Sequence, residues 1–553
     1  MIASHWDILL LPRTDAFQNE YLPPHEEIIK AITGFTGSAG FLVLRRDGTG
    51  ALFVDGRYLL QATQEVDTQK ITIVSLLQTS PTEWVRANIN TVPNAAPRHS
   101  IGFDPWRMTP KQYKAWQTLA VSINATLCPL PVGWEKSLWL HRPPPIPSRI
   151  SEHPEHIAGQ PRTEKIALVR QALSRHQAAA CLISDPASVC WLLNIRGRDV
   201  PFTPLVCGYA LVYTNDPVLL FVNGDGFCPD GVKLKPLQDL LPILSDISGT
   251  VLLDNQTASA ALAEHLGEKA LLKENPCLLP KACKNAFEIN GARAAHHRDG
   301  KALSEFLNWL RSEVRRRPVT EAEAASTLDS FRGKQDHFIM PSFPSIIGSG
   351  PNGAIIHYRP PDTGSRVITR GELLLIDSGG QYIDGTTDVT RTIWLWDETP
   401  PADIRRAYTL VLKGHIAIAT ARFPTATTGA QLDVLARRFL WQAGLDYDHG
   451  TGHGVGAFLS VHEGPQGISK RNTVPLQPGM ILSNEPGYYK PGAFGIRIEN
   501  LVLVRDDLPL PTGFERPMLG FETLTKAPFE EALIETSMLT SDEKAFLLTG
   551  QHS

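Results

Sequence analysis

The sequence predicts two α/β domains in tandem, followed by an α+β domain that carries the chemistry. The chain has 553 residues, which is too long for a single hydrophobic core. Strand-like and helical patterns alternate through the first half, as in α/β domains, whereas the last part has long helices followed by extended segments. We therefore expect domains at residues 1–140, 141–285 and 286–553.

The composition is that of an ordinary globular protein, with 42% hydrophobic and 20% charged residues. The net charge of −4 argues against the basic surface of a nucleic-acid-binding protein. The N-terminal sequence lacks the pattern of a secretory signal, and no uncharged apolar stretch approaches the length of a membrane span. The seven cysteines have neither metal-ligand spacing nor an even number. These features predict a cytoplasmic protein that binds neither nucleic acid nor membranes.

The first domain begins with strand-like segments joined by turns. A glycine-rich turn at 34–40 leads into an apolar strand at 41–44, and a second strand at 51–54 ends in the Asp-Gly-Arg-Tyr motif at 55–58. A helical pattern begins after this motif. The proline-rich stretch at 142–147 is typical of a stiff linker to the next domain.

The second domain resembles a loose repeat of the first. A helix at 163–176 precedes a strand at 178–183, and further strands are expected at 209–213 and 218–222. The strand end Phe-Val-Asp-Gly at 53–56 matches Phe-Val-Asn-Gly at 221–224, and both follow an extended pair after a glycine-containing turn. The match favours two related domains, although two unrelated α/β units would share part of it.

The third domain begins with helices and continues with strands. Helical patterns cover 286–317, 321–331, 404–421 and 430–443. Extended segments are predicted at 355–358, 372–377, 389–395, 480–484 and 495–504. Antiparallel strands with helices alongside them predict an α+β domain.

Two aspartates stand at the ends of neighbouring strands in this domain. The apolar run 373–376 ends in Asp377, and Asp388 directly precedes the next strand. A hairpin of this length would place the two carboxylates side by side, where they repel each other unless one is protonated or a cation lies between them. For either aspartate alone, capping of a turn at a strand end is the simpler interpretation.

Histidines and glutamates follow farther along the chain. Residues 449–456 read His-Gly-Thr-Gly-His-Gly-Val-Gly, and the glycines around His453 would let the backbone approach another group closely. His462 follows in a Val-His-Glu sequence, and Glu485 ends an extended segment. Arg497 and Glu499 are two residues apart, so we expect them on the same face of one strand.

Five of these residues form an oxygen-rich set with a single nitrogen ligand: Asp377, Asp388, His453, Glu485 and Glu499. Such ligands suit Mn²⁺ or a similar ion better than a thiolate site would. Two divalent ions would neutralise the four carboxylates and one would not, which favours a dinuclear centre. Two neighbouring metal ions can share a hydroxide as the nucleophile and polarise a carbonyl group.

The order Asp-Asp-His-Glu-Glu, with gaps of 11, 65, 32 and 14 residues, resembles the ligand set of the pita-bread metallopeptidase family. That family includes methionine aminopeptidase, prolidase and aminopeptidase P. Nearly the whole chain is similar to the three-domain, cytosolic aminopeptidases P, through motifs at 15–21, 34–40, 55–58, 350–358, 453–456, 461–463 and 519–522. Phe17 and Thr36 depart from the family pattern, and neither is a ligand position there. The resemblance implies two creatinase-like α/β domains and a pita-bread catalytic domain.

The resemblance also implies roles for the five ligands. Asp377 would bind one metal ion, and His453 and Glu485 would bind the other. Asp388 and Glu499 would bridge both ions. The bridging hydroxide would attack the scissile carbonyl, with Glu485 as the proton acceptor.

Further residues receive roles from the same resemblance. His357 and His462 would contact the substrate and the tetrahedral intermediate, so that the catalytic residues are His357, His462 and Glu485. Arg57, from the first domain, would contact the substrate. Arg497 would steady the metal-bound oxygens, and His449 would support the site. By itself, His357 could be a half-buried strand histidine and Arg57 a solvated charge at a strand end.

The implied reaction is that of an Xaa-Pro aminopeptidase, which releases the N-terminal residue from peptides with proline in the second position. Two divalent ions per chain are implied, with Mn²⁺ expected and Zn²⁺ or Co²⁺ as alternatives. Peptides with an N-terminal Xaa-Pro would be the substrates, and the family suggests a homodimer.

Two other functions remain alternatives. A prolidase cuts only X-Pro dipeptides, and the two large N-terminal domains count against it. A non-catalytic pita-bread binding protein would keep the fold as an interaction surface, and the complete ligand set counts against it. The same set counts against creatinase, which shares the fold but lacks the metal ligands.

Overall fold

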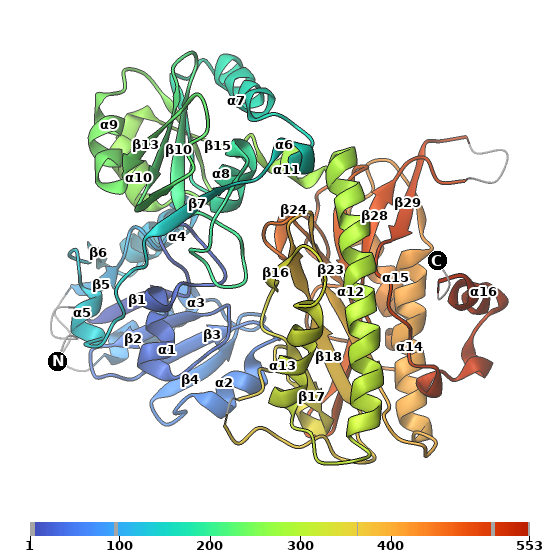
Figure 1. Cartoon of the computed structure of the whole chain (residues 1–553). Helices are drawn as coiled ribbons and strands as arrows, with labels where there is room; N and C mark the ends of the chain where they lie inside the picture. The colour runs from blue at the N-terminus through green and yellow to red at the C-terminus, as the bar shows by residue number, and fades with distance from the viewer. Residues whose placement is uncertain (1–5, 93–97, 362, 510–514, 551–553) are drawn as a thin grey trace. The chain divides into compact units, whose positions relative to one another are not determined.

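The computed structural model describes residues 6–92, 98–361, 363–509 and 515–550 (Figure 1). The chain forms two compact units. Residues up to 153 together with 161–277 make the first unit, and residues 154–160 together with those from 278 onward make the second. The division into three domains at 1–140, 141–285 and 286–553 stays a proposal, in which the first unit holds most of the first two domains.

The first unit contains two six-stranded sheets. One has the strand order β4-β3-β2-β1-β5-β6 and consists of β1 (Ile8–Pro12), β2 (Phe41–Arg45), β3 (Gly50–Val54), β4 (Ile71–Ser75), β5 (His99–Phe103) and β6 (Ala125–Pro129). The other has the order β13-β11-β10-β8-β14-β15 and consists of β8 (Ala180–Ile183), β10 (Gly208–Tyr213), β11 (Val218–Val222), β13 (Val232–Pro236), β14 (Val251–Asp254) and β15 (Ala270–Lys273).

The two sheets share one topology. In each, three strands pair in antiparallel fashion around a middle strand. β2 pairs with β1 and β3 in the first sheet, and β10 pairs with β8 and β11 in the second. The remaining strands add in parallel at both edges. The matching segments 53–56 and 221–224 include the last two residues of β3 and β11, which hold equivalent positions in the two sheets. The prediction of two related α/β domains in tandem is therefore confirmed.

Helices cover both faces of these sheets, because alternate residues of the central strand are apolar on both sides. Ile8 and Leu10 of β1 belong to one hydrophobic cluster, and Leu9 and Leu11 belong to another. The helices of the first unit are α1 (Ile28–Thr33), α2 (Leu59–Glu65), α3 (Pro81–Asn88), α4 (Pro110–Ser122), α5 (Glu135–Leu138), α7 (Arg162–His176), α8 (Pro186–Leu193), α9 (Leu240–Asp246) and α10 (Ala260–Leu266). A small sheet, β12-β7-β9, consists of β7 (Ser148–Glu152), β9 (Ile195–Arg196) and β12 (Gly224–Gly226).

Two helix pairs enclose the strands of the second unit (Figure 1). α12 (Ala286–Glu313) packs with α13 (Glu321–Arg332), and α14 (Ala402–Ala419) packs with α15 (Gly429–Trp441). α12 begins at a capping box in which Asn285 and Glu288 each satisfy a backbone N–H of the other. The short helices are α6 (Glu155–Ala158), α11 (Leu278–Ala282) and α16 (Ser541–Gly550).

The strands of the second unit form three main sheets and a hairpin, as the α+β prediction requires. The sheets β16-β19-β20 and β17-β18-β21 consist of β16 (Phe338–Pro341), β17 (Ile346–Ser349), β18 (Leu374–Ser378), β19 (Gly380–Tyr382), β20 (Gly385–Thr386) and β21 (Val389–Ile393). The sheet β22-β29-β28-β25-β23-β24 consists of β22 (Arg422–Pro424), β23 (Gly452–Gly454), β24 (Glu463–Ile468), β25 (Ile481–Asn484), β28 (Asn500–Arg505) and β29 (Met518–Thr523). β26 (Gly487–Lys490) and β27 (Phe494–Arg497) form the hairpin.

Two predicted strands are wrong. Residues 355–358 form a turn, in which the Tyr358 N–H donates to the Ile355 carbonyl, rather than a strand. The segment 495–504 is two strands, β27 and β28, and Glu499 lies between them. The strand breaks there because Ile498 bonds to Pro486 and Glu499 bonds to Thr390, so the chain changes pairing partners at this point.

The state of the cysteines and the character of the helices bear on the expectations from composition. All seven cysteines are free thiols. Among the described residues, no helix combines the length and apolar character needed to cross a bilayer.

Candidate metal centre

Antiparallel pairing of β18 with β21 brings Asp377 and Asp388 to the same end of one sheet. Asp377 pairs with Thr390 across the two strands, and Asp388 immediately precedes β21. The hairpin predicted from the sequence is therefore present. Both carboxylates are buried, and the charge of Asp377 acts on Asp388.

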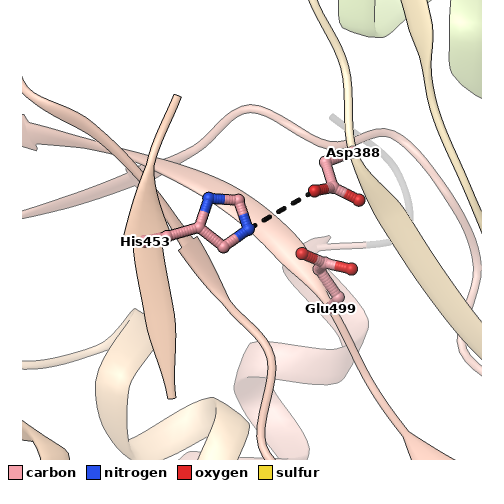
Figure 2. Close-up of side chains that lie close together, drawn as sticks. All are labelled: Asp388, His453 and Glu499. Carbon is pink, nitrogen blue, oxygen red and sulfur yellow. Dashed lines mark ion pairs between the residues drawn. The ribbon is translucent and has the colours of Figure 1, made fainter. Parts of the chain in front are cut away.

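The remaining three predicted ligands come from the six-stranded sheet and its edge. His453 lies on β23, Glu485 directly follows β25, and Glu499 lies between β27 and β28. One ligand atom each of Asp388, His453 and Glu499 lies within 4.8 Å of the others, and Figure 2 shows these side chains converging. Nε2 of His453 is 3.6 Å from Oδ2 of Asp388 and 3.5 Å from Oε1 of Glu485.

The glycines around His453 have a definite structural reason. A Cβ atom on Gly452 would lie 1.9 Å from the carbonyl oxygen of Ser483, so only glycine lets β23 approach this neighbour. The Ser483 hydroxyl accepts a hydrogen bond from the His453 N–H at 2.9 Å and donates one to Oε1 of Glu485 at 3.1 Å. Ser483 thus links two of the predicted ligands.

The carboxylates repel one another strongly in this buried setting. Burial raises the pKa of Asp388 well above its ordinary value, and the charges of Asp377 and Glu485 raise it further. Burial and then Asp388 raise the pKa of Glu499 in the same way. Burial also raises the pKa of Glu485, despite the opposing positive charges of His453 and Arg497.

The residues present fit a pair of divalent cations. Among the described residues, no group donates a hydrogen bond to Oδ1 of Asp377, Oδ1 of Asp388 or Oε1 of Glu499, although all three atoms are buried. Buried carboxylate oxygens without donors are costly unless a cation binds them. Carboxylates with one imidazole are ligands that Mn²⁺, Zn²⁺ and Co²⁺ accept.

Arg497 and its neighbours surround the acidic cluster. Nη2 of Arg497 donates to Oδ2 of Asp377 at 2.7 Å, and Nη1 donates to the Tyr489 hydroxyl at 2.7 Å. The Tyr489 hydroxyl also lies 2.9 Å from Nε2 of His449. The expectation that Arg497 and Glu499 share one strand is wrong, but both side chains still contact Thr390.

The two accessory histidines, His357 and His462, lie in different segments of the chain. The ring of His462 lies perpendicular to that of His453, with the ring centroids 4.4 Å apart. His357 lies in the turn 355–358, not in a strand, and the preceding carbonyl, that of Ile356, accepts a hydrogen bond from Arg497 at 3.3 Å.

Arg57 belongs to the first unit. Its guanidinium forms a bidentate pair with Asp55, with Nε to Oδ1 at 2.9 Å and Nη2 to Oδ2 at 2.8 Å. This pair orients the side chain at the end of β3. Contact of Arg57 with a substrate stays a prediction.

Several supporting residues escaped the sequence analysis. Thr390 lies two residues after Asp388, and strand alternation alone could have indicated that both point to one face. Ser483 lies two residues before Glu485 and offered the same signal. Tyr489 had no such signal, because its contacts with Arg497 and His449 depend on how distant segments fold together. The same holds for His415 on α14, whose ring bonds to Asn484 and Asn500.

Comparison with known proteins adds independent support. The profile of metallopeptidase family M24 matches residues 290–506, and that of its C-terminal region matches 517–549. Two creatinase/prolidase N-terminal domain profiles match 25–130 and 141–288. These matches agree with the predicted fold class.

Similar proteins match almost the whole length of the chain. A probable Xaa-Pro aminopeptidase P of Aspergillus niger is 39% identical over 97% of this chain and 90% of its own length. A probable Xaa-Pro aminopeptidase P of Talaromyces marneffei is 37% identical over 99% of this chain and 86% of its own.

Two solved structures are similar over different shares of the chain. The X-prolyl aminopeptidase of Caenorhabditis elegans, described as a cytosolic enzyme with a di-nuclear active site, has a TM-score of 0.92 and 31% identity, covering 99% of this chain and 90% of its own. The prolidase of Pyrococcus furiosus has a TM-score of 0.51 and 26% identity, and it covers 65% of this chain and 99% of its own.

Proposed function

The chain belongs to the Xaa-Pro aminopeptidases P of metallopeptidase family M24, and we propose that it releases the N-terminal residue from peptides whose second residue is proline. The observation that carries this proposal is the cluster of the buried Asp388 and Glu499 with the partly exposed His453, bordered by Asp377 and Glu485. Similarity over almost the full length to relatives that bear this name supports the substrate class.

We assign the five ligands as the family resemblance suggests. Asp377 would hold one ion, His453 and Glu485 the other, and Asp388 and Glu499 both. Two bound divalent ions would polarise the scissile carbonyl and make a water molecule a nucleophile near neutral pH. We propose that both metal ions are Mn²⁺, with Zn²⁺ or Co²⁺ as alternatives.

We propose that Glu485 moves the proton in this reaction. Its side chain is 18% exposed and that of His453 is 23% exposed, whereas that of Asp388 is 5% exposed, so the cluster is open on the side of Glu485 and His453. Glu485 would accept a proton from the attacking water and deliver it to the proline nitrogen as the C–N bond breaks. The Ser483 hydroxyl orients the carboxylate for both transfers.

The two accessory histidines would act on the substrate. As negative charge develops on the scissile carbonyl oxygen, His462 would donate a hydrogen bond to it. His357 would bind the peptide beside the cluster. Arg57 is proposed as a substrate contact, Arg497 as the residue that fixes Asp377, and His449 as its support through Tyr489.

The chemistry of the substrate explains why a dedicated enzyme is needed. An X-Pro bond is a tertiary amide without the N–H that many proteases bind. A prolidase remains the alternative, but the P. furiosus prolidase covers only 65% of this chain, and the aminopeptidase relatives cover almost all of it. A non-catalytic pita-bread binding protein is the other alternative, and it offers no reason to bring four carboxylates together.

The direct test compares three peptides after EDTA treatment and Mn²⁺ add-back. Metal-dependent release of arginine from Arg-Pro-Pro, without cleavage of Arg-Pro or Arg-Ala-Ala, is expected. Cleavage of Arg-Pro alone would identify a prolidase. No cleavage of any peptide by protein with bound metal would overturn the proposal. Metal analysis of the reloaded protein should give two ions per chain.

We also propose a location and an assembly state. A cytoplasmic location agrees with the seven free cysteines and with the description of the C. elegans enzyme as cytosolic. A homodimer follows from the resemblance, and light scattering of the purified protein would give its mass directly.

A further inference from the structure

Next to the candidate site, two lysines hold a buried glutamate. Oε2 of Glu463 lies 3.0 Å from Nζ of Lys281, and Oε1 pairs with Nζ of Lys284. The three side chains are only 1–3% exposed. Ionised groups this deeply buried are costly, and an apolar trio of the same size would often be as stable. Stability alone therefore does not explain why these three charged side chains are buried together.

The position of Glu463 supplies that explanation. It begins β24 and directly follows His462, whose ring contacts that of His453. The backbone of Glu463 also pairs with Gly454 of β23, and a Cβ on Gly454 would lie 2.5 Å from the Glu463 carbonyl oxygen. A single peptide bond thus joins the ion-paired residue to the imidazole that we place on the substrate.

His462 itself stands outside regular structure, in the loop between β23 and β24. The loop is closed at its start by the Gly456 N–H, which donates to the Ser460 carbonyl at 2.9 Å. Nε2 of Gln381 donates to the Leu459 carbonyl at 2.8 Å. His462 lies outside the strands that the structure describes, and the anchors on either side of it hold the loop that carries its ring against that of His453.

We propose that Lys281, Lys284 and Glu463 are positioning residues, which set His462 against the metal centre. Lys281 lies on α11 and Lys284 in the segment between α11 and α12, so the ion pairs connect the end of the loop to these helices. This inference rests on the proposed function, because it assigns His462 to the substrate. None of the three residues is assigned contact with the substrate.

The decisive experiment is a double-mutant cycle between Glu463→Gln and His462→Ala. Glu463→Gln keeps the shape of the side chain and removes its charge, and we expect kcat on Arg-Pro-Pro to fall about 10- to 100-fold. The KM and the metal content should stay close to those of the wild type. In the His462→Ala background, Glu463→Gln should change kcat less than about twofold, because both substitutions remove the same contribution.

A second variant covers the case in which Glu463→Gln fails to fold. The triple variant Lys281→Met, Lys284→Met, Glu463→Gln removes all three buried charges together and should fold. Its kcat should remain low. A wild-type kcat in the folded triple variant would overturn the proposal. So would a double-mutant cycle in which Glu463→Gln lowers kcat equally with and without His462→Ala.

The control is the same substitution at another glutamate that is paired with two cations but lies away from His462. Glu522 also pairs with two cations, Arg293 and Arg505, but it adjoins no candidate ligand and its side chain is 25% exposed. Glu522→Gln should leave kcat unchanged and should act independently of His462→Ala.

One readout does not depend on activity. In a spectrum of ¹³C-labelled histidine rings, the resonance that disappears in His462→Ala should shift in Glu463→Gln and stay in place in Glu522→Gln. An inactive wild type would overturn the proposed function alone, whereas an unshifted His462 resonance would overturn this inference.

Discussion

The Thr390 hydroxyl donates a hydrogen bond to Oε2 of Glu499, and the two oxygens are 2.7 Å apart. Nε of Arg497 donates to the same hydroxyl at 3.2 Å. The other carboxylate oxygen, Oε1, is buried and has no donor among the described residues. Thr390 therefore fixes one oxygen of Glu499 and leaves the other for a cation, as the outer partners of metal ligands do.

Thr390→Val should weaken metal binding with little change in fold. The substitution keeps the size of the side chain and removes the hydroxyl, so the affinity for Mn²⁺ should fall about 10- to 100-fold. Calorimetric titration of the EDTA-treated protein measures it. Thr392→Val is the matched control, because Thr392 lies on the same strand and bonds to the backbone of Arg497 instead. Equal affinities for the two variants would contradict the role of Thr390.

Asp388→Asn should stabilise the metal-free protein and abolish its response to metal. In the absence of cations, the negative charges of Asp377 and Glu485 repel that of Asp388. Removing the charge of Asp388 relieves this repulsion. The free energy of unfolding at pH 8 should rise by about 1 kcal/mol or more. Urea denaturation with and without Mn²⁺ measures both effects.

The control for this substitution is Asp403→Asn, at an exposed position of α14. It should change neither quantity. Glu499→Ala, like Asp388→Ala, should abolish metal binding and hydrolysis. Full activity in either of these variants would refute the dinuclear assignment.

His462→Ala should fold and bind two metal ions but lose most of its kcat. Loss of one hydrogen-bond donor to a developing oxyanion typically lowers kcat about 10²- to 10³-fold. Steady-state kinetics on Arg-Pro-Pro, together with metal analysis, separates catalysis from metal binding. His297→Ala, at an exposed position of α12, is the control. An unchanged rate for His462→Ala would remove this residue from the site.

His415 should make stability depend on pH. Its Nδ1 donates to the Asn484 carbonyl at 3.0 Å, and its Nε2 accepts from Asn500 at 3.1 Å. Burial, followed by the charge of Arg391, lowers the pKa of His415 to about 3. The unfolded state, with a pKa of about 6.5, binds the proton more readily between these values, so stability is lost as the pH falls from about 6.5 toward 3.

The contribution of His415 between pH 6.5 and pH 5 is about 2 kcal/mol. His415→Gln should remove this part of the pH dependence, measured by urea denaturation of the metal-free protein. The exposed His156, replaced by Gln, should leave it unchanged. The same pH slope in His415→Gln as in the wild type would contradict the assignment.

The sequence predicted much of the fold because its signals are local. Apolar runs marked the strands around Asp377 and Glu485, and the matching strand ends at 53–56 and 221–224 indicated two related domains. The errors occurred where distant contacts overrule local pattern. Residues 355–358 look like a strand but form a turn, and the apolar alternation at 495–504 conceals the break at Glu499.

By itself, the sequence determined the types of the candidate ligands, their order and the family to which the chain belongs, because these depend only on which residues occur and at what spacing. Only the tertiary structure decided that Thr390 contacts Glu499, that Arg497 contacts Asp377, and that Lys281 and Lys284 hold Glu463. These contacts join residues as far apart as Lys281 and Glu463, which lie 182 positions apart in the chain. They arise from strand pairing and burial across the whole domain, which no short stretch of sequence specifies.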